Sequence, residues 1–201
     1  MTLALDIETA NYSHEIGGWG NTHLFEPTVV ATWDGNSGTV YCNKGDSIRD
    51  DLPDVTIKSL HPRVLGDALT KEVASGGLII GHNIKKFDLP VLRDSLDCWS
   101  AGDIMYKSKE SIIDTSNLLR SVIGHAVPLS DVVHHTLGRD KMMKSEDAPL
   151  EWRRGQYGKV VKYCLDDAKL SYDLWEHGKI EGFVKARSRD TGAVTEYEVN
   201  W

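Results

Sequence analysis

The sequence predicts a single α/β domain whose mixed β-sheet is flanked by α-helices. Thr2 to Glu8 alternates between apolar and polar residues, which is typical of a β-strand. Two further strand-like runs, 28–33 and 39–42, are joined by the turn sequence D-G-N-S-G, which indicates a β-hairpin. From Leu78 onward, short apolar runs alternate with helical patterns, as they do around a sheet with parallel strands. The 201 residues therefore suit one domain, 1–201.

The first strand is expected to present two acidic residues at its end. Its odd-numbered positions are apolar and are expected to face the core: Leu3, Leu5 and Ile7. The opposite face carries the even-numbered positions, Ala4, Asp6 and Glu8. Burial of the apolar face therefore limits where the acid pair can point.

The remaining elements follow from helical spacing and from turn residues. Helices are expected at 63–74, 114–124, 130–137 and 155–177, the last ending at Gly178. Leu78–Ile80 is a strand candidate that runs through G-H-N into a helix with Leu89, Leu92 and Leu96 on one stripe. Irregular structure is expected at 11–27, in a linker with Pro53 and Pro62, and at 139–154. The tail, 183–201, is expected to form a hairpin around Asp190-Thr191-Gly192.

The composition is that of an ordinary globular protein, with 40% hydrophobic and 26% charged residues. No apolar run approaches the length needed to cross a membrane, and the first residues lack the basic segment of a signal peptide. The three cysteines, Cys42, Cys98 and Cys164, form no C-x-x-C pair, so neither a zinc site nor a disulfide framework is indicated. We expect a cytoplasmic protein with no membrane partner.

The net charge of -7 argues against a passive nucleic-acid coat protein, which would normally show a basic surface. It does not exclude a nuclease, because carboxylates that bind metal add negative charge and only a local basic strip is needed. Candidates for such a strip are Lys85, Lys86, Arg139, Lys141, Lys144, Arg153 and Arg154.

Three separated clusters supply the candidate catalytic residues. They are Asp6 and Glu8 in D-I-E-T, Asp88 in G-H-N-I-K-K-F-D, and Tyr163 and Asp167 in Y-C-L-D-D. Residues two apart on a strand, or four apart on a helix, share a face, so both pairs can converge. Mg²⁺ and Mn²⁺ prefer oxygen ligands, and two cations about 4 Å apart can clamp the attacking and leaving oxygens of a phosphodiester. The pattern therefore favours phosphodiester hydrolysis.

Each cluster also has a purely structural interpretation. A D-x-E pair on a strand is commonly exposed, and Asp88 before Leu89-Pro90 fits a helix N-cap. Tyr163 fits the edge of an amphipathic helix, and Gly81-His82-Asn83 fits a tight strand-to-helix turn. The order of the three clusters along the chain, rather than any one of them, favours a site.

These motifs resemble those of the DEDD superfamily of 3′-to-5′ exonucleases, which have a ribonuclease-H-like fold. The third motif resembles that of the tyrosine-bearing branch, DEDDy, because the position that carries His in the sister branch is Lys162 here. The resemblance covers about residues 3 to 180. More narrowly, the chain is similar to stand-alone predicted exonucleases related to the proofreading domains of family B DNA polymerases.

The resemblance implies that two divalent cations, Mg²⁺ or Mn²⁺, are held by four carboxylates: Asp6, Glu8, Asp88 and Asp167. It implies that Tyr163 positions the attacking water, and Asp167 rather than Asp166 keeps the spacing of the motif. Thr9, His82 and Asn83 are expected to bind the terminal nucleotide. Trp19 is the best tryptophan candidate for base stacking.

The implied activity is 3′-to-5′ hydrolysis of single-stranded nucleic acid, DNA favoured over RNA, to nucleoside 5′-monophosphates. The substrate needs a free 3′ end, and a helicase or polymerase partner would suit this activity. One alternative is a catalytically silent module on the same fold that binds nucleic acid or protein. Another is a ribonuclease-H-like nuclease or recombinase that cuts internally, although such enzymes lack the helical Y-x-x-x-D.

Overall fold

The computed structural model describes residues 2–45, 48, 52 and 55–201, so Pro53 of the expected linker lies outside the described residues. A mixed six-stranded sheet forms its centre, with strand order β4-β3-β2-β1-β5-β6. The six strands are β1 (Thr2–Thr9), β2 (Pro27–Trp33), β3 (Gly38–Cys42), β4 (Thr56–Lys58), β5 (Leu78–Gly81) and β6 (Ile112–Asp114). The predicted α/β fold with a mixed sheet is confirmed, and it is consistent with a ribonuclease-H-like fold.

The sheet combines an antiparallel hairpin with parallel pairs. β1, β2 and β3 are antiparallel neighbours, and the predicted turn between β2 and β3 is held by Asp34, whose Oδ1 accepts from the amides of Asn36 and Ser37. β5 pairs in parallel with both β1 and β6, and β4 pairs in parallel with β3. Adjacent parallel strands bring their carboxyl ends to one edge of a sheet. The ends of β1, β5 and β6 therefore lie together.

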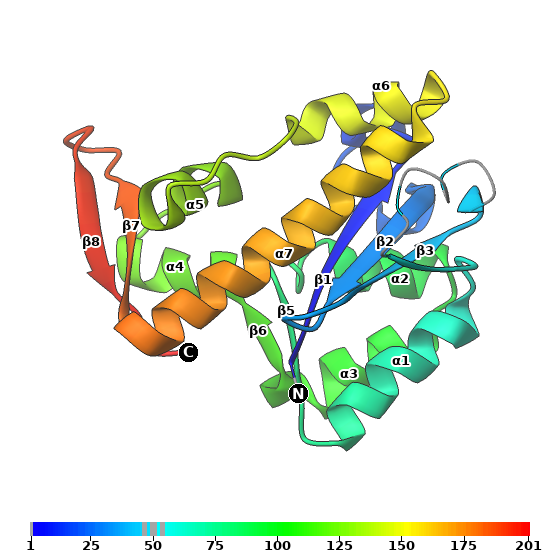
Figure 1. The fold of residues 1–201 in the computed structure, drawn as a ribbon, viewed down its shortest axis with the longest axis horizontal. Helices are drawn as coiled ribbons and strands as arrows, with labels where there is room; N and C mark the ends of the chain where they lie inside the picture. The colour runs from blue at the N-terminus through cyan, green and yellow to red at the C-terminus, as the bar shows by residue number, and fades with distance from the viewer. Residues whose placement is uncertain (1, 46–47, 49–51, 53–54) are drawn as a thin grey trace.

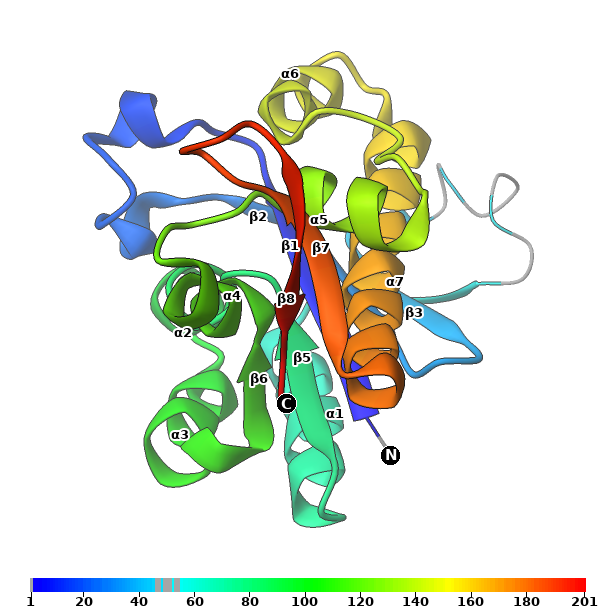
Figure 2. The same ribbon diagram turned by 90° about the vertical axis from the view of Figure 1, so that its left-hand side faces the viewer.

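Helices cover both faces of the sheet (Figures 1 and 2). The helices are α1 (Pro62–Ala74), α2 (Asp88–Ser95), α3 (Trp99–Lys107), α4 (Thr115–Ile123), α5 (Leu129–Leu137), α6 (Ala148–Arg153) and α7 (Tyr157–Glu181). Side chains of α1, α2 and α3 form a core with one face, while α6 and α7 form a core with the other. Figure 1 shows α7 crossing the sheet diagonally.

Both faces of β1 are covered. Ala4, on the face of the acids, is fully buried beside Ile80 and Trp175 of α7. Leu3, expected in the core, is only partly buried. The helix α7 therefore covers the face of β1 at Ala4, whereas Asp6 and Glu8, nearer the carboxyl end of the strand, border the cleft.

A second, smaller layer lies beside the end of α7. The tail forms the antiparallel hairpin of β7 (Phe183–Arg187) and β8 (Val194–Glu198). Leu174 of α7 packs there against Val184 of β7 and against apolar residues of α4 and α5. This layer forms the left-hand end of the molecule in Figure 1.

The structure also corrects several predicted boundaries. The predicted end of the last helix at Gly178 is wrong, because α7 continues to Glu181 and Gly182 is its left-handed C-cap. Gly178 is instead a contact point, since a Cβ there would lie 2.5 Å from the indole of Trp201. The strands β4 and β6 and the helix α3 were not predicted. The helix α6 lies inside the segment 139–154 that was expected to be irregular.

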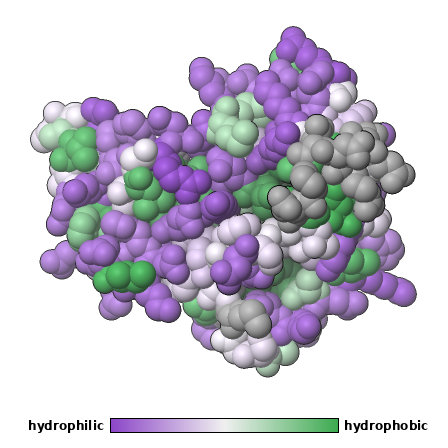
Figure 3. Space-filling model, in the orientation of Figure 1, coloured by the Kyte–Doolittle hydropathy of each residue, from purple (hydrophilic) through white to green (hydrophobic). Residues whose placement is uncertain are grey.

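The surface is predominantly hydrophilic in the orientation of Figure 1, with small hydrophobic patches (Figure 3). Within the described part of the chain, no helix has both the length and the apolar composition that a membrane crossing requires.

Candidate active site

The candidate acids converge at the edge where β1, β5 and β6 end. Asp6 and Glu8 lie on β1, opposite Ala31 and Val29 of β2. The helix α7 lies close to this strand: the Cys164 thiol is 3.4 Å from the main-chain oxygen of Asp6. Asp167 follows Cys164 by about one helical turn and therefore faces the same point.

Three of the four predicted metal-binding carboxylates form one cluster. Asp6, Glu8 and Asp167 each present an oxygen, and these oxygens all lie within 4.8 Å of one another. Asp88, at the first residue of α2, lines the same cleft. The structure thus brings together carboxylates from a strand and two helices that are distant in the sequence.

Burial makes this cluster electrostatically unfavourable without a cation. Burial, reinforced by the charge of Asp167, raises the pKa values of Asp6 and Glu8 well above their ordinary values. Burial, with the nearby charges of Asp114 and Asp167, raises the pKa of Asp88 to about 8. Carboxylates that share a buried site disfavour one another's ionised form.

Two carboxylate oxygens in the cluster also lack hydrogen bonds. Asp6 Oδ2 and Asp167 Oδ1 are inaccessible to solvent and accept no hydrogen bond from the described residues. Buried polar atoms are normally satisfied, so unpartnered oxygens in an all-oxygen donor set fit a hard divalent cation. The residues present therefore suit Mg²⁺ or Mn²⁺.

Asp114, the residue before α4, organises the loop that leads to Asp88. It caps α4 by accepting from the amide of Asn117 at 3.0 Å. It also contacts the loop after β5, where it accepts from the main-chain amides of Asn83 and Lys85 at 3.1 and 3.0 Å. This loop starts at Gly81, where a Cβ would lie only 3.0 Å from the main-chain oxygen of Leu5. The close approach of β1 and the loop explains the glycine.

The proposed N-cap role of Asp88 is not what the structure shows. Phe87 occupies the N-cap position of α2, and Asp88 is the first helical residue. Asp88 is buried and borders the cleft. Its place at the positive end of α2 favours its carboxylate form, against the effect of burial.

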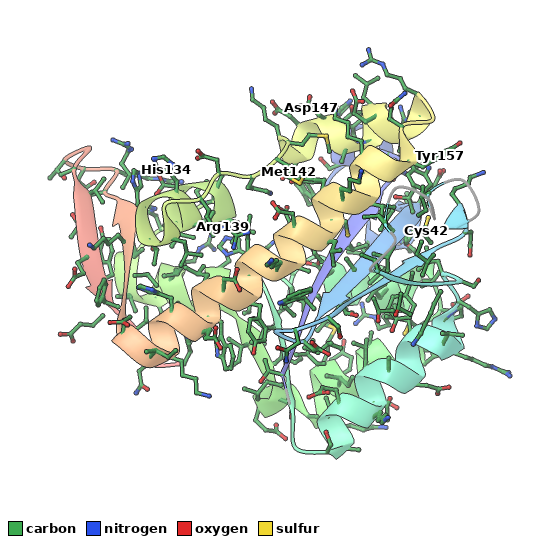
Figure 4. All side chains as sticks on the ribbon, viewed as in Figure 1. Cys42, His134, Arg139, Met142, Asp147 and Tyr157 are labelled. Atoms are coloured by element: carbon green, nitrogen blue, oxygen red, sulfur yellow. The ribbon has the colours of Figure 1, made fainter. Side chains whose placement is uncertain are left out.

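A lysine enters the carboxylate cluster from the connection between α5 and α6. Lys141 Nζ lies 2.5 Å from Asp167 Oδ2, and the lysine side chain is only 12% exposed. The connection is fixed to α7 next to this point, because Arg139 pairs with Asp173 and lies 3.5 Å from Asp166. Figure 4 shows Arg139 and Met142 on this connection, beside α7. The sequence marked Lys141 only as one of several basic candidates, since a contact between distant segments leaves no local signal.

Tyr163 does not line the cleft in this structure. Its ring is 1% exposed, and its hydroxyl lies 2.8 Å from Ser145 Oγ. Lys141 Nζ lies 4.9 Å from the centre of the ring and covers it. The predicted pairing of Tyr163 with Asp167 on one helical face is present, but the segment 141–145 separates the tyrosine from the cleft. By contrast, Asp166 lies outside the cleft beside Arg139.

The three residues predicted to bind the terminal nucleotide all line the cleft. Thr9 is buried and donates to the main-chain oxygen of Asn11 at 3.0 Å. His82 uses both ring nitrogens inside the protein, at 3.0 Å from Thr115 Oγ1 and 2.9 Å from the main-chain oxygen of Val127. Asn83 has a left-handed backbone, with φ of 74°. Of the three, Asn83 alone has a side chain without a hydrogen bond to the described residues.

Burial lowers the pKa of His82 to about 4, so the ring is neutral at physiological pH. The carbonyl of Val127 can only accept, which makes Nε2 the donor and Nδ1 the acceptor from Thr115. His82 therefore supports the wall of the cleft.

The cleft is large and has an aromatic wall. Its volume is about 1210 Å³, above the usual range for a small-molecule pocket. Trp19, Phe25 and Phe87 line it, with ring centres 5.1 to 5.9 Å apart. Trp19 is 66% exposed and is thus free to stack on a planar ligand.

Five of the seven candidates for a basic strip do not line the cleft: Lys85, Lys86, Arg139, Arg153 and Arg154. Arg153 pairs with Glu15 through both terminal nitrogens, and Arg154 lies 3.2 Å from Glu151. Lys144 and Lys159 line the cleft, together with Lys141. These three lysines supply positive charge at the cleft, and each has an acidic neighbour: Asp167 for Lys141, Glu146 for Lys144 and Glu151 for Lys159.

No protein-family model matches this chain, and no curated protein matches it.

Proposed function

We propose that this protein is a metal-dependent 3′-to-5′ exonuclease acting on single-stranded nucleic acid, with DNA favoured over RNA. The observation that carries the proposal is the cluster of Asp6, Glu8 and Asp167, whose oxygens lie within 4.8 Å of one another in a large cleft. Asp88 on the same cleft supplies a fourth carboxylate. The direction of cleavage rests on the resemblance of the three motifs to those of the exonuclease superfamily.

In this proposal the four carboxylates hold two cations, Mg²⁺ or Mn²⁺. Such ions, when bound, neutralise the phosphate and assist both the attacking and the leaving oxygen. Buried carboxylates without full hydrogen bonding are suited to this task, since they offer lone pairs that no protein group uses.

The protein's other residues bind and orient the substrate. The rings of Trp19 and Phe87 offer stacking surfaces for bases, and base stacking is tolerant of sequence. Asn83 faces the cleft with an unused amide, which suits a sugar or base oxygen. Lys144 and Lys159 line the same cleft and can contact the phosphate backbone.

Tyr163 would orient the attacking water, but its hydroxyl now contacts Ser145. The proposal therefore requires the segment 141–145 to shift when substrate and metal bind. Polar contacts of Lys141 and Ser145 hold this segment, together with Met143, which packs against the core between the sheet and α7, while Met142 is exposed.

A cytoplasmic location remains part of the proposal. Cys42, Cys98 and Cys164 are all free thiols, as expected in a reducing compartment.

The deciding experiment is a nuclease assay with matched single-stranded DNA and RNA, each labelled at the 5′ end, in Mg²⁺ or Mn²⁺. Wild-type protein should give a descending ladder of products, and Asp6→Ala should give none while retaining its thermal unfolding transition. The faster substrate identifies the preferred sugar. The same reaction with excess chelator in place of added metal tests the metal requirement.

A circular single strand provides the matched substrate control, because an exonuclease needs an end. Cleavage of the circle would instead support an internally cutting enzyme. If neither linear substrate is degraded with either metal, the binding-module alternative replaces the proposal.

A further inference from the structure

A second hollow lies between α4, the end of α7 and the β7–β8 hairpin. Its volume is about 550 Å³, and none of the residues that line it lines the carboxylate cleft. Figure 2 shows β8 between α4 and β7, so one edge of β8 faces the side of α4. We call this hollow the hairpin groove.

The hairpin groove combines an apolar floor with an acidic rim. Apolar residues of both layers form the floor: Leu118, Val122, Phe183, Val199 and Trp201. Val122 is 47% exposed, so part of this floor is uncovered. The rim carries three exposed glutamates, Glu181, Glu196 and Glu198.

The acidic charge of the rim is largely uncompensated. Glu196 approaches Lys185 at 3.9 Å, a distance typical of a loose surface pair. Glu181 and Glu198 form no ion pair with any described residue. The rim therefore presents negative charge to whatever enters the groove.

The edge of β7 that faces α5 is already satisfied. The amide of Lys185 donates to Thr136 Oγ1 at 2.9 Å, and the same hydroxyl donates to the carbonyl of Lys185 at 3.1 Å. The amide of Arg187 donates to Asp131 at 2.9 Å. Side chains of α5 thus replace a neighbouring strand on this side.

The edge of β8, by contrast, has backbone groups that pair with no described residue. Lys185 lies opposite Glu196 but directs its backbone toward α5, so this is a non-hydrogen-bonded pair. In an antiparallel ladder the backbone groups of such a residue point to the outer edge, which places those of Glu196 there. Glu198, two residues on, repeats the arrangement opposite Phe183.

We propose that the hairpin groove binds an extended segment of a partner protein that alternates basic and apolar residues and adds to β8 as a third strand. Strand addition uses the free backbone groups, and pockets beside the edge select alternate side chains. Basic side chains would face the three glutamates, and apolar ones would cover Val122 and the floor. A second copy of this chain does not fit, because paired β8 edges would bring like charges together.

The probe is a fluorescent synthetic peptide of alternating lysine and valine, with blocked ends. Fluorescence anisotropy with the full chain in Mg²⁺ should show saturable binding. The double variant Glu196→Gln, Glu198→Gln should bind about fivefold more weakly or worse, since each exposed pair contributes a modest free energy. Glu110→Gln, an exposed acid outside the groove, should bind like wild type.

Two further arms separate strand addition from simple charge attraction. A peptide of the same sequence whose backbone amides are N-methylated keeps its side chains and charge, but it cannot donate along the edge in either strand orientation and should lose binding. Asp167→Asn, in the carboxylate cleft, should leave the affinity unchanged.

Three results would each overturn the proposal: no binding of the peptide, equal affinity for the double variant and wild type, or equal binding of the N-methylated peptide. The glutamates would then serve only to keep the edge from self-association. Loss of binding in Asp167→Asn would show that the peptide binds in the cleft, and this result would also overturn the proposal. None of these outcomes bears on hydrolysis, because the groove and the cleft share no residue.

Discussion

The carboxylate cleft and the hairpin groove are both acidic, but they differ in how their acids meet solvent. Glu8, Asp88 and Asp167 are buried in the cleft, where burial raises their pKa values. The rim glutamates of the groove, such as Glu196 and Glu198, are exposed. A buried acid needs a specific cation at contact distance, whereas an exposed acid contributes a diffuse field that salt screens. The same residue type thus supports the proposed metal site in one place and the proposed docking surface in the other.

The sharpest test of this difference uses adjacent residues of α7. Asp167→Asn removes one charge from the buried cluster, and we expect hydrolysis to fall by about a thousandfold, since a bound metal contributes several kcal/mol to the transition state. Asp166→Asn makes the same chemical change beside Arg139, outside the cleft, and should change the rate by less than about threefold. The measurement is the initial rate on linear single-stranded DNA. Similar rates for the two variants would remove Asp167 from the site.

The second test removes the positive charge that Lys141 brings to the carboxylate cluster and measures stability. Lys141→Met leaves Asp167 buried without its partner, so we expect the metal-free protein to lose about 3 kcal/mol of stability. Lys144→Met, at a side chain that is 79% exposed, should cost less than about 0.5 kcal/mol. Thermal or urea unfolding in chelator measures both.

Metal should then stabilise Lys141→Met more than it stabilises the wild type, because a cation and Lys141 compete for Asp167. An unfolding transition for Lys141→Met that matches Lys144→Met in chelator would show that the buried ion pair contributes nothing.

Stability of the cleft should also depend on pH in a direction set by its raised pKa values. Asp88 has a pKa of about 8 in the folded protein, above its ordinary value of 3.8. Between these values the folded protein binds more protons than the unfolded chain, so stability falls as pH rises. The slope reaches at most about 1.4 kcal/mol per pH unit for one group.

Urea unfolding in chelator, repeated from pH 5 to pH 8 in steps of about one unit, measures this slope. Asp88→Asn should flatten it, and saturating Mg²⁺ should do the same because bound metal keeps the carboxylates ionised. A stability that rises with pH in chelator would contradict the buried, protonated state of the cluster.

The part of this site that the sequence could predict consists of residue pairs at the regular spacing of a strand or a helix. Two-residue spacing aligned Asp6 with Glu8, and four-residue spacing aligned Tyr163 with Asp167, because strand and helix geometry fix those faces. Lys141 lies in a segment without periodicity and reaches Asp167 through a contact between distant parts of the chain. Gly178 looked like a helix end, but its small size serves the packing of Trp201 instead. Local patterns therefore predicted which residues share a face, while the partners across the fold required the structure.

The smallest expected effect belongs to the groove. The double variant Glu196→Gln, Glu198→Gln should change unfolding stability by less than about 0.5 kcal/mol, at any pH from 5 to 8, because exposed charges gain and lose little on folding. Its hydrolysis of linear DNA should equal that of wild type, since the groove shares no residue with the cleft. Thermal unfolding and the nuclease assay, run side by side, check both statements. A loss of stability or of activity would mean that the two acidic regions are coupled through α7, whose last turn contributes Glu181 to the groove and whose middle contributes Asp167 to the cleft.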